Sequence, residues 1–238
     1  MRAIVLHSIP YTDSSRIVRI FTESNGLRAY LVRGVGKKRS SSNALLQPLS
    51  LVEITERERS RGSLHQIAEH KRAAVLTHMS IEPYKAMLAM FMAELVQHCI
   101  AEDHAHPELF DYLWNSTQMM DIDDQPGVYA ILLAGRLMKF LGVMPDEMPL
   151  GFRQEEGFLD LASGHWSYRA PLHNAVIEGQ LGSYLRSSCA ESPEAFRRYS
   201  LTRNDLRSLL DAQVMYLQLH INDQRELKSL EVLREVFA

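Results

Sequence analysis

Cysteine is scarce in this chain of 238 residues, which contains only Cys99 and Cys189. The two are far apart and form no Cys-x-x-Cys pair, which argues against a disulfide framework and against a four-cysteine zinc site. Both cysteines lie in apolar, helix-like contexts and are expected in the core. Such sparse cysteine fits a reducing compartment, so we expect a cytoplasmic protein.

Long uninterrupted hydrophobic runs are also missing. The longest apolar windows, such as Val128–Val143, contain Arg136 and Lys139, so we predict no membrane span. The first residues, Met1–Leu6, form one short apolar stretch that runs into polar residues, and we expect no signal peptide.

Catalytic motifs are absent as well. The segment Gly34–Lys38 resembles a phosphate loop, but the Walker pattern needs Gly where Leu31 stands and Ser or Thr where Lys38 stands. The acidic stretch Asp121–Asp124 resembles the start of a calcium loop but lacks the required Gly and distal Glu, and a connection between helices is the better interpretation. There is no Gly-x-Ser-x-Gly elbow and no His-Glu-x-x-His pattern, and we predict that the chain is not an enzyme.

One group of metal-ligating residue types is close in sequence. A metal site there is conceivable, but neighbouring helical residues point in different directions, and a polar helix end is the favoured interpretation. We therefore predict no metal and no cofactor. The group consists of His98, Cys99, Glu102, Asp103, His104 and His106.

Charge is distributed unevenly along the chain. Residues 1–80 carry 13 Lys and Arg against 6 Asp and Glu, a net charge of +7, whereas residues 81–238 carry 13 against 23, a net charge of −10. A basic first part joined to an acidic remainder indicates two units with different partners.

The most strongly cationic segment is Arg33–Ser42, with the sequence RGVGKKRSSS. Four positive charges fall within seven residues and no acid interrupts them. A flexible cationic loop suits a polyanion without a shaped pocket, so nucleic acid is the first partner to consider. The predicted phosphate contacts are Arg16, Arg28, Arg33, Lys37, Lys38 and Arg39, and Tyr11 and Tyr30 are candidates for base stacking. Further arginines would add to this surface if they share a face with it, namely Arg2, Arg19, Arg57, Arg59 and Arg61.

The first 75 residues are predicted to form short strands. An Asn25-Gly26 hairpin signal separates two of them, and close spacing of five strands around a basic loop favours a small β-barrel of the OB type. The expected strands are Ala3–Leu6, Arg16–Thr22, Leu27–Val32, Leu49–Thr55 and Ser63–Glu69.

Residues 76–238 change to a helical period. Helices are predicted to start at Pro83, Pro107 and Pro126, and the last of these is apolar nearly all round and ends at Gly142. Residues 146–170 contain several glycines and aromatics and are expected to form an irregular lobe or a β-hairpin inserted in the helical domain. Helices are expected to resume near Pro171, with an N-terminal cap at Thr202-x-x-Asp205. The expected fold class is thus α+β, an N-terminal five-stranded OB-fold barrel followed by an α-helical domain.

The order of these features resembles the RecO family of DNA repair proteins, most strongly over residues 1–54 and weakly between residues 80 and 200. The residues that carry the resemblance are Ala3–His7, Tyr11–Thr22, Gly26-Leu27, Arg33–Lys38, Leu46–Leu49, His220-Ile221 and Leu227–Leu230.

This resemblance implies a recombination mediator without ordinary enzymatic turnover. Such a protein binds single- and double-stranded DNA and anneals complementary strands. With RecR it helps load RecA onto single-stranded DNA coated by single-stranded DNA-binding protein, and it contacts the acidic tail of that protein. A nucleoid-associated location follows from these partners.

The sequence departs from the family pattern in the lobe. Many members carry a four-cysteine zinc lobe where this chain has residues 150–170, and here that segment contains no cysteine. Phe158, Leu161, His165 and Trp166 are expected to stabilise the lobe by packing instead of zinc. An alternative function from another class stays open at this point: a protein-interaction scaffold whose basic module binds an acidic partner tail.

Overall fold

A computed structural model describes residues 1–35, 43–57, 64–221 and 225–236 of the chain. The chain divides into two compact units, Met1–Asp124 and Gln125–Ala238. Within the described residues, no helix combines the length and the apolar character that crossing a membrane requires.

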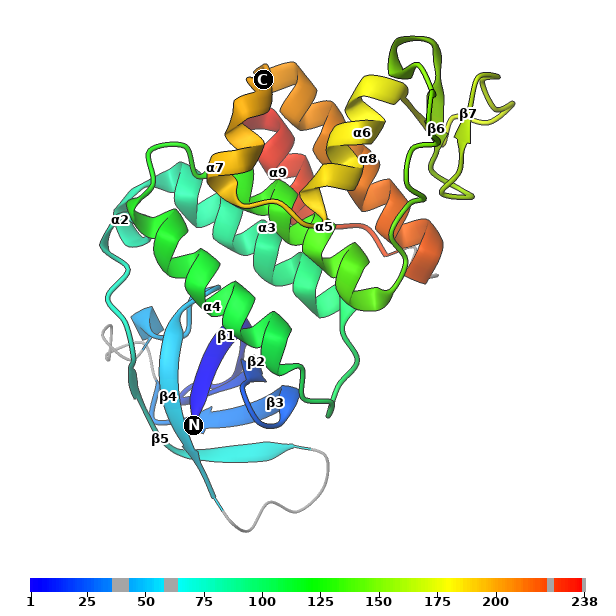
Figure 1. The fold of residues 1–238 in the computed structure, drawn as a ribbon. Coiled ribbons are helices and arrows are strands. Elements are labelled where there is room, and N and C mark those ends of the chain that lie inside the picture. Colours follow the sequence, from blue (N-terminus) through cyan, green and yellow to red (C-terminus); the bar gives the residue numbers. More distant parts are fainter. Residues whose placement is uncertain (36–42, 58–63, 222–224, 237–238) are drawn as a thin grey trace. The chain divides into compact units, whose positions relative to one another are not determined.

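A closed five-stranded barrel forms the first part of the Met1–Asp124 unit (Figure 1). Its strands are β1 (Arg2–Thr12), β2 (Ser15–Thr22), β3 (Gly26–Arg33), β4 (Leu51–Glu56) and β5 (His65–Arg72). They follow one another in the order β1-β2-β3-β5-β4, and β4 closes the barrel by pairing with β1. All pairs are antiparallel except β3 with β5, and the predicted OB-type barrel is confirmed.

The barrel interior is filled by alternate residues of the strands. Alternation sends every second side chain inward, and the strand residues that pack there are small or β-branched apart from Tyr30. The buried cluster consists of Ala3, Val5, Val18, Ile20, Tyr30, Val32, Val35, Leu46, Val52, Ile54 and Ile67.

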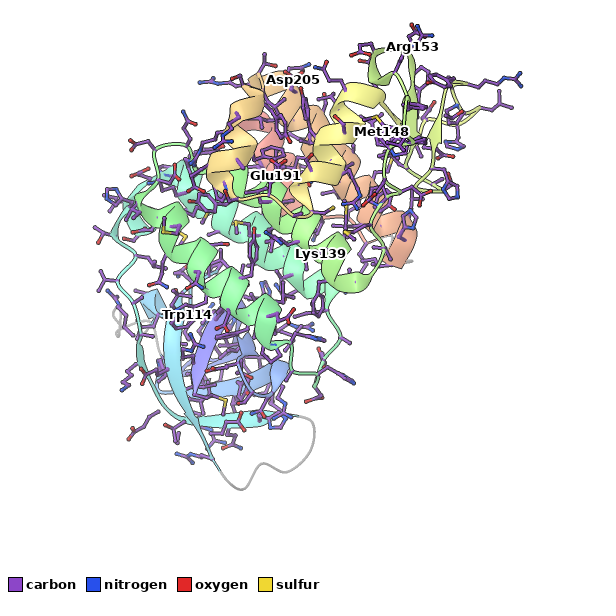
Figure 2. All side chains as sticks on the ribbon, in the orientation of Figure 1. Trp114, Lys139, Met148, Arg153, Glu191 and Asp205 are labelled. Atoms are coloured by element: carbon purple, nitrogen blue, oxygen red, sulfur yellow. The ribbon has the colours of Figure 1, made fainter. Side chains whose placement is uncertain are left out.

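Three helices complete this unit: α2 (Thr77–Ile81), α3 (Pro83–Cys99) and α4 (Pro107–Ile122). The helix starts predicted at Pro83 and Pro107 are confirmed, whereas α2 was not predicted. The ring of Phe110 on α4 packs edge-on against Phe21 of β2, with 5.5 Å between ring centroids. Trp114, labelled on α4 in Figure 2, stacks on Phe110 and is almost fully buried. An aromatic contact therefore fixes α4 on the barrel.

The Gln125–Ala238 unit is mainly helical. Its central helix α5 (Gly127–Leu141) is buried on almost every side, as its apolar sequence predicts, and it ends at Gly142 in the left-handed conformation with φ 72°. Around it are α6 (Gly179–Ser188), α7 (Pro193–Phe196), α8 (Arg203–Ile221) and α9 (Lys228–Val236), with 3-10 turns η1 (Gln154–Glu156) and η2 (Arg197–Tyr199). The predicted cap of α8 is confirmed, because the amide of Asp205 donates to Thr202 Oγ1 and the amide of Thr202 donates to Asp205 Oδ2.

The lobe is a three-stranded sheet in the order β7-β6-β8, from β6 (Phe158–Asp160), β7 (Trp166–Ser167) and β8 (Val176–Glu178). The expectation that helices resume near Pro171 was wrong, because β8 follows that residue and α6 begins only at Gly179. Phe152 stacks on Tyr168 at 4.3 Å and contacts Trp166 edge-on. Leu161 is buried as expected, whereas His165 is exposed and its Nδ1 lies 2.6 Å from Asp146 Oδ2. Aromatic packing, joined by polar contacts, holds the sheet.

Candidate nucleic-acid interface

The predicted contacts Arg16 and Arg28 lie at opposite ends of the barrel. In the β2–β3 register Arg16 is opposite Val32 and Arg28 is opposite Ile20, and both of these partners belong to the barrel interior. Arg16 and Arg28 therefore occupy inward-facing positions of their strands but lie at different levels along the barrel. Arg16 and Ile20 are four positions apart in β2, which places Arg16 and Arg28 roughly 14 Å apart along the strands. We call the end with Arg16 the tip end and the end with Arg28 the base end.

The tip end is built from the β1–β2 turn and the end of β3. Arg16 Nε donates to Ser8 Oγ at 2.6 Å and its terminal nitrogen donates to the Ser8 carbonyl at 3.0 Å, so the guanidinium is held in one orientation by neutral groups. Arg33, the last residue of β3, is exposed and has no ion pair or side-chain hydrogen bond among the described residues. Two guanidinium groups at this end thus keep their full positive charge.

The basic segment leaves the barrel at this same end. The amides of Gly34 and Val35 both donate to the carbonyl of Ser14, at 2.8 and 3.1 Å, which ties the end of β3 to the β1–β2 turn. Gly34 has φ 77°, a conformation that favours glycine, and it turns the chain out of the sheet. Lys37, Lys38 and Arg39 lie outside the described residues. The described residues that precede them, Arg33–Val35, lie at the tip end.

The base end is different, because Arg2, Arg19 and Arg28 each have an acidic partner there. Arg28 Nε donates to Asp103 Oδ1 at 2.6 Å, and Arg19 forms an ion pair with Glu102. Arg2 binds both Glu23, at 2.9 Å, and Asp111, at 2.8 Å, and its guanidinium also lies over the rings of Phe110 and Trp114. The Arg2 guanidinium beside Glu23 lowers the pKa of that carboxyl below its usual value. The predicted contact Arg28 is therefore already occupied by a carboxylate of the chain.

The acidic partners come from the α3–α4 connection, which docks on the edge of β3. Glu102 forms an isolated parallel bridge with Leu27, and the Asp103 amide donates to the Leu27 carbonyl at 3.0 Å. The connection passes so close that a Cβ on Gly26 would lie 1.8 Å from the carbonyl oxygen of His104. From this connection Glu102 pairs with Arg19 and Asp103, in the left-handed conformation with φ 61°, pairs with Arg28.

The two tyrosines considered for stacking differ in position. Tyr30 is fully buried in the barrel, and its hydroxyl donates to Glu56 Oε1 at 2.6 Å, so its proposed stacking role was wrong. Tyr30 points inward because it shares the alternation of Val32, which is also in the buried cluster. Burial raises the pKa of the Tyr30 hydroxyl, and the hydrogen bond to Glu56 raises it further. Tyr11 near the end of β1 has 59% of its surface exposed and remains a stacking candidate at the tip end.

The remaining cations of the barrel are scattered. Arg57 and Arg72 are exposed, and neither has an ion pair among the described residues, whereas Lys71 binds Glu53 at 2.8 Å. Arg59 and Arg61 lie outside the described residues. In the described parts of the chain, no three His, Cys, Asp or Glu side chains gather as a metal site would need.

The role of Glu102 and Asp103 was not predicted from the sequence, where they were interpreted as part of a polar helix end. Their only sequence signal is an acidic pair between two helix patterns. Pairing with arginines that lie 83 and 75 residues earlier in the chain depends on how α3 and α4 fold back on the barrel.

Family models identify both parts of the chain. Residues 1–75 match the model described as "Recombination protein O N terminal", and residues 82–231 match "Recombination protein O C terminal". The chain belongs to the RecO family.

Individual RecO proteins are similar over nearly their whole length. The DNA repair protein RecO of Phocaeicola vulgatus is 31% identical, with 99% of this chain and 97% of the relative covered. The RecO protein of Bacteroides fragilis is 30% identical, with 98% of this chain and 97% of the relative covered. The RecO protein of Christiangramia forsetii is 27% identical, with 99% of this chain and 98% of the relative covered. The N-terminal RecO model covers the whole barrel, including both of its ends.

Proposed function

We propose that this chain is a DNA-binding recombination mediator that acts in DNA repair and homologous recombination. The observation that carries the proposal is the tip end of the barrel, where Arg16 and Arg33 keep unpaired charges beside the start of the basic segment. Membership of the RecO family supports DNA as the polyanion, since its similar members are DNA repair proteins.

The proposed mechanism is charge neutralisation followed by strand annealing. Arg16, Arg33 and the cluster Lys37, Lys38 and Arg39 bind phosphates of two strands, with Tyr11 stacking on a base. Release of counterions from the phosphates supplies much of the binding free energy, and a lower charge on each strand lets complementary bases approach. Arg28 contributes only when its ion pair with Asp103 opens. No step requires a catalytic residue.

The finer parts of the proposal concern partners and organisation. With RecR, the chain helps load RecA onto single-stranded DNA that is coated by single-stranded DNA-binding protein, and it works in the cytoplasm at the nucleoid. Residues 1–75 form the DNA-binding domain, and residues 76–238 form the helical domain with its zinc-free lobe. These statements rest on the functions that family membership implies.

The test is a fluorescence-anisotropy titration with a single-stranded oligonucleotide, combined with an annealing assay with and without single-stranded DNA-binding protein. The variant K37A/K38A/R39A should bind more weakly whatever the sequence, and its salt slope should fall by about 0.7 for each lost phosphate contact. A charge-matched control, R198A/R203A/R207A, changes three arginines of the other unit.

Two results would overturn the proposal. An unchanged affinity and salt slope in K37A/K38A/R39A would remove the basic segment from the interface. Absence of any DNA binding by the native chain, with binding of an acidic peptide instead, would support the scaffold alternative.

A further inference from the structure

The acidic pair Glu102 and Asp103 occupies two arginines in the way that phosphates would. Each carboxylate forms a charge-assisted contact with one guanidinium, the same chemistry by which arginine binds a phosphate oxygen. The carboxylates face solvent more than the arginines do, because the Glu102 and Asp103 side chains are 54% and 61% exposed against 34% for Arg19 and 22% for Arg28. The acids thus cover the arginines from the side on which a polyanion would approach.

We propose that Glu102 and Asp103 restrict DNA to the tip end of the barrel by acting as built-in substitutes for phosphate at the base end. This inference rests on the proposed function and adds the residues that set where on the barrel the strand binds. Without the acidic pair, Arg19 and Arg28 would extend the phosphate-binding track by two contacts.

The backbone, and not the ion pairs, holds the acidic segment in place. The Leu27–Glu102 bridge and the hydrogen bond from the Asp103 amide to the Leu27 carbonyl involve no side chain. The close passage of His104 over Gly26 is also a backbone contact. Amide replacements of the two acids therefore leave the segment docked while they remove its negative charge.

The experiment compares E102Q/D103N with native protein by anisotropy titration against single-stranded DNA at several salt concentrations. The variant should bind more tightly, and two new contacts should steepen the salt slope by about 1.4 in all. A slope change of that size makes the ratio of variant to native affinity rise about sevenfold when salt falls from 200 to 50 mM.

The matched control is E108Q/D124N, which removes two exposed carboxylates of the same unit that have no ion pair among the described residues. A second control adds R19A to E102Q/D103N, and it should cancel about half of the gain because one of the two freed guanidinium groups is then missing. Circular dichroism and the unfolding midpoint verify that each variant is folded.

The outcomes separate this inference from the proposed function. Tighter binding by E102Q/D103N but not by E108Q/D124N, cancelled in part by R19A, supports the inference. Equal gains in both double variants would reveal only a general charge effect and would overturn it, as would no gain in either. If the native chain fails to bind DNA, the proposed function fails first.

Discussion

The buried carboxylate of Asp121 should be the most sensitive polar group in the Met1–Asp124 unit. Asp121 lies near the end of α4 and accepts the amide hydrogens of Thr77, at 3.1 Å, and Met79, at 2.6 Å, both in α2. No side chain of α2 itself caps that helix start. The backbone carbonyl of Asp121 also accepts a hydrogen bond from the buried ammonium of Lys85 on α3, at 2.7 Å. One residue therefore joins α2, α3 and α4.

The expected loss of unfolding free energy depends on whether the amides of Thr77 and Met79 can find other acceptors once the Asp121 carboxylate is gone. The Thr77 amide is partly exposed and can bond to water in a variant, whereas the Met79 amide is buried and would lose its partner. A buried unsatisfied donor costs about 1–3 kcal/mol, and a lost helix cap costs about 1 kcal/mol. We expect D121A to lower the free energy of unfolding by about 3 kcal/mol. D121N, whose amide oxygen can still accept one bond, should lower it by about 2 kcal/mol.

The assay uses the chain's two tryptophans, which lie in different units. Trp114 is on α4 and Trp166 is in the lobe, so a W166F background makes fluorescence report on the Met1–Asp124 unit alone. Urea unfolding of D121N and D121A in that background gives the change in midpoint at constant slope. The matched control is D124N, which removes the same charge three residues later from an exposed position.

A shift of the D121N midpoint no larger than that of D124N would refute the reasoning. Such a result would mean that water, or a rearranged α2, satisfies the Met79 amide. A change in the slope rather than the midpoint would indicate a less compact native state and would also contradict the capping argument.

Two further predictions concern Gly26 and Cys189. G26A should destabilise the Met1–Asp124 unit by about 3 kcal/mol, because Gly26 has φ 71° and a Cβ there would lie 1.8 Å from the His104 carbonyl oxygen. The control G142A has φ 72° but no atom within 4 Å of the Cβ, so it should show the backbone strain alone, about 1–2 kcal/mol. Equal losses of stability for the two variants in chemical denaturation would contradict the steric clash. Burial raises the pKa of the Cys189 thiol to about 11, so the thiol should stay protonated at pH 8. It should therefore not react with a disulfide reagent until the protein is denatured, and rapid labelling of Cys189 in the native protein would contradict this prediction.

Strands and helices were predicted well where a turn signal, an alternation or a proline marks them within a few residues. The Asn25-Gly26 turn and the alternation around it gave β2 and β3 almost to the residue, and the prolines at positions 83 and 107 marked two helix starts. Strand β1 was predicted only as Ala3–Leu6 because its second half, up to Thr12, is largely exposed. That half is held by pairing with β2, which hydrophobicity does not reveal.

The candidate site was harder to predict, because the state of a charge depends on contacts that are distant in sequence. Arg28 and Arg33 were both predicted as phosphate contacts, yet the structure shows one ion-paired and the other exposed. Tyr30 failed as a stacking residue for a simpler reason, since the register of β3 sends it inward with Val32. Alternation could have shown that Tyr30 and Val32 share a face, but not which face is inside.

Net charge is a poor guide to this barrel, and the reason supports the division into two ends. The first 80 residues have a net charge of +7, but the whole Met1–Asp124 unit carries 14 Lys and Arg against 15 Asp and Glu, a net charge of −1. A polyanion would gain little from such a unit if its charges were evenly mixed. They are not, because Glu102, Asp103 and Asp111 lie against arginines of the base end. The tip end is roughly 14 Å away from Arg28, which exceeds the Debye length of about 8 Å at physiological salt. Acids paired with arginines of the base end therefore change the field at the tip end only weakly, and a nearly neutral unit can keep the cationic side chains Arg16 and Arg33 at that end.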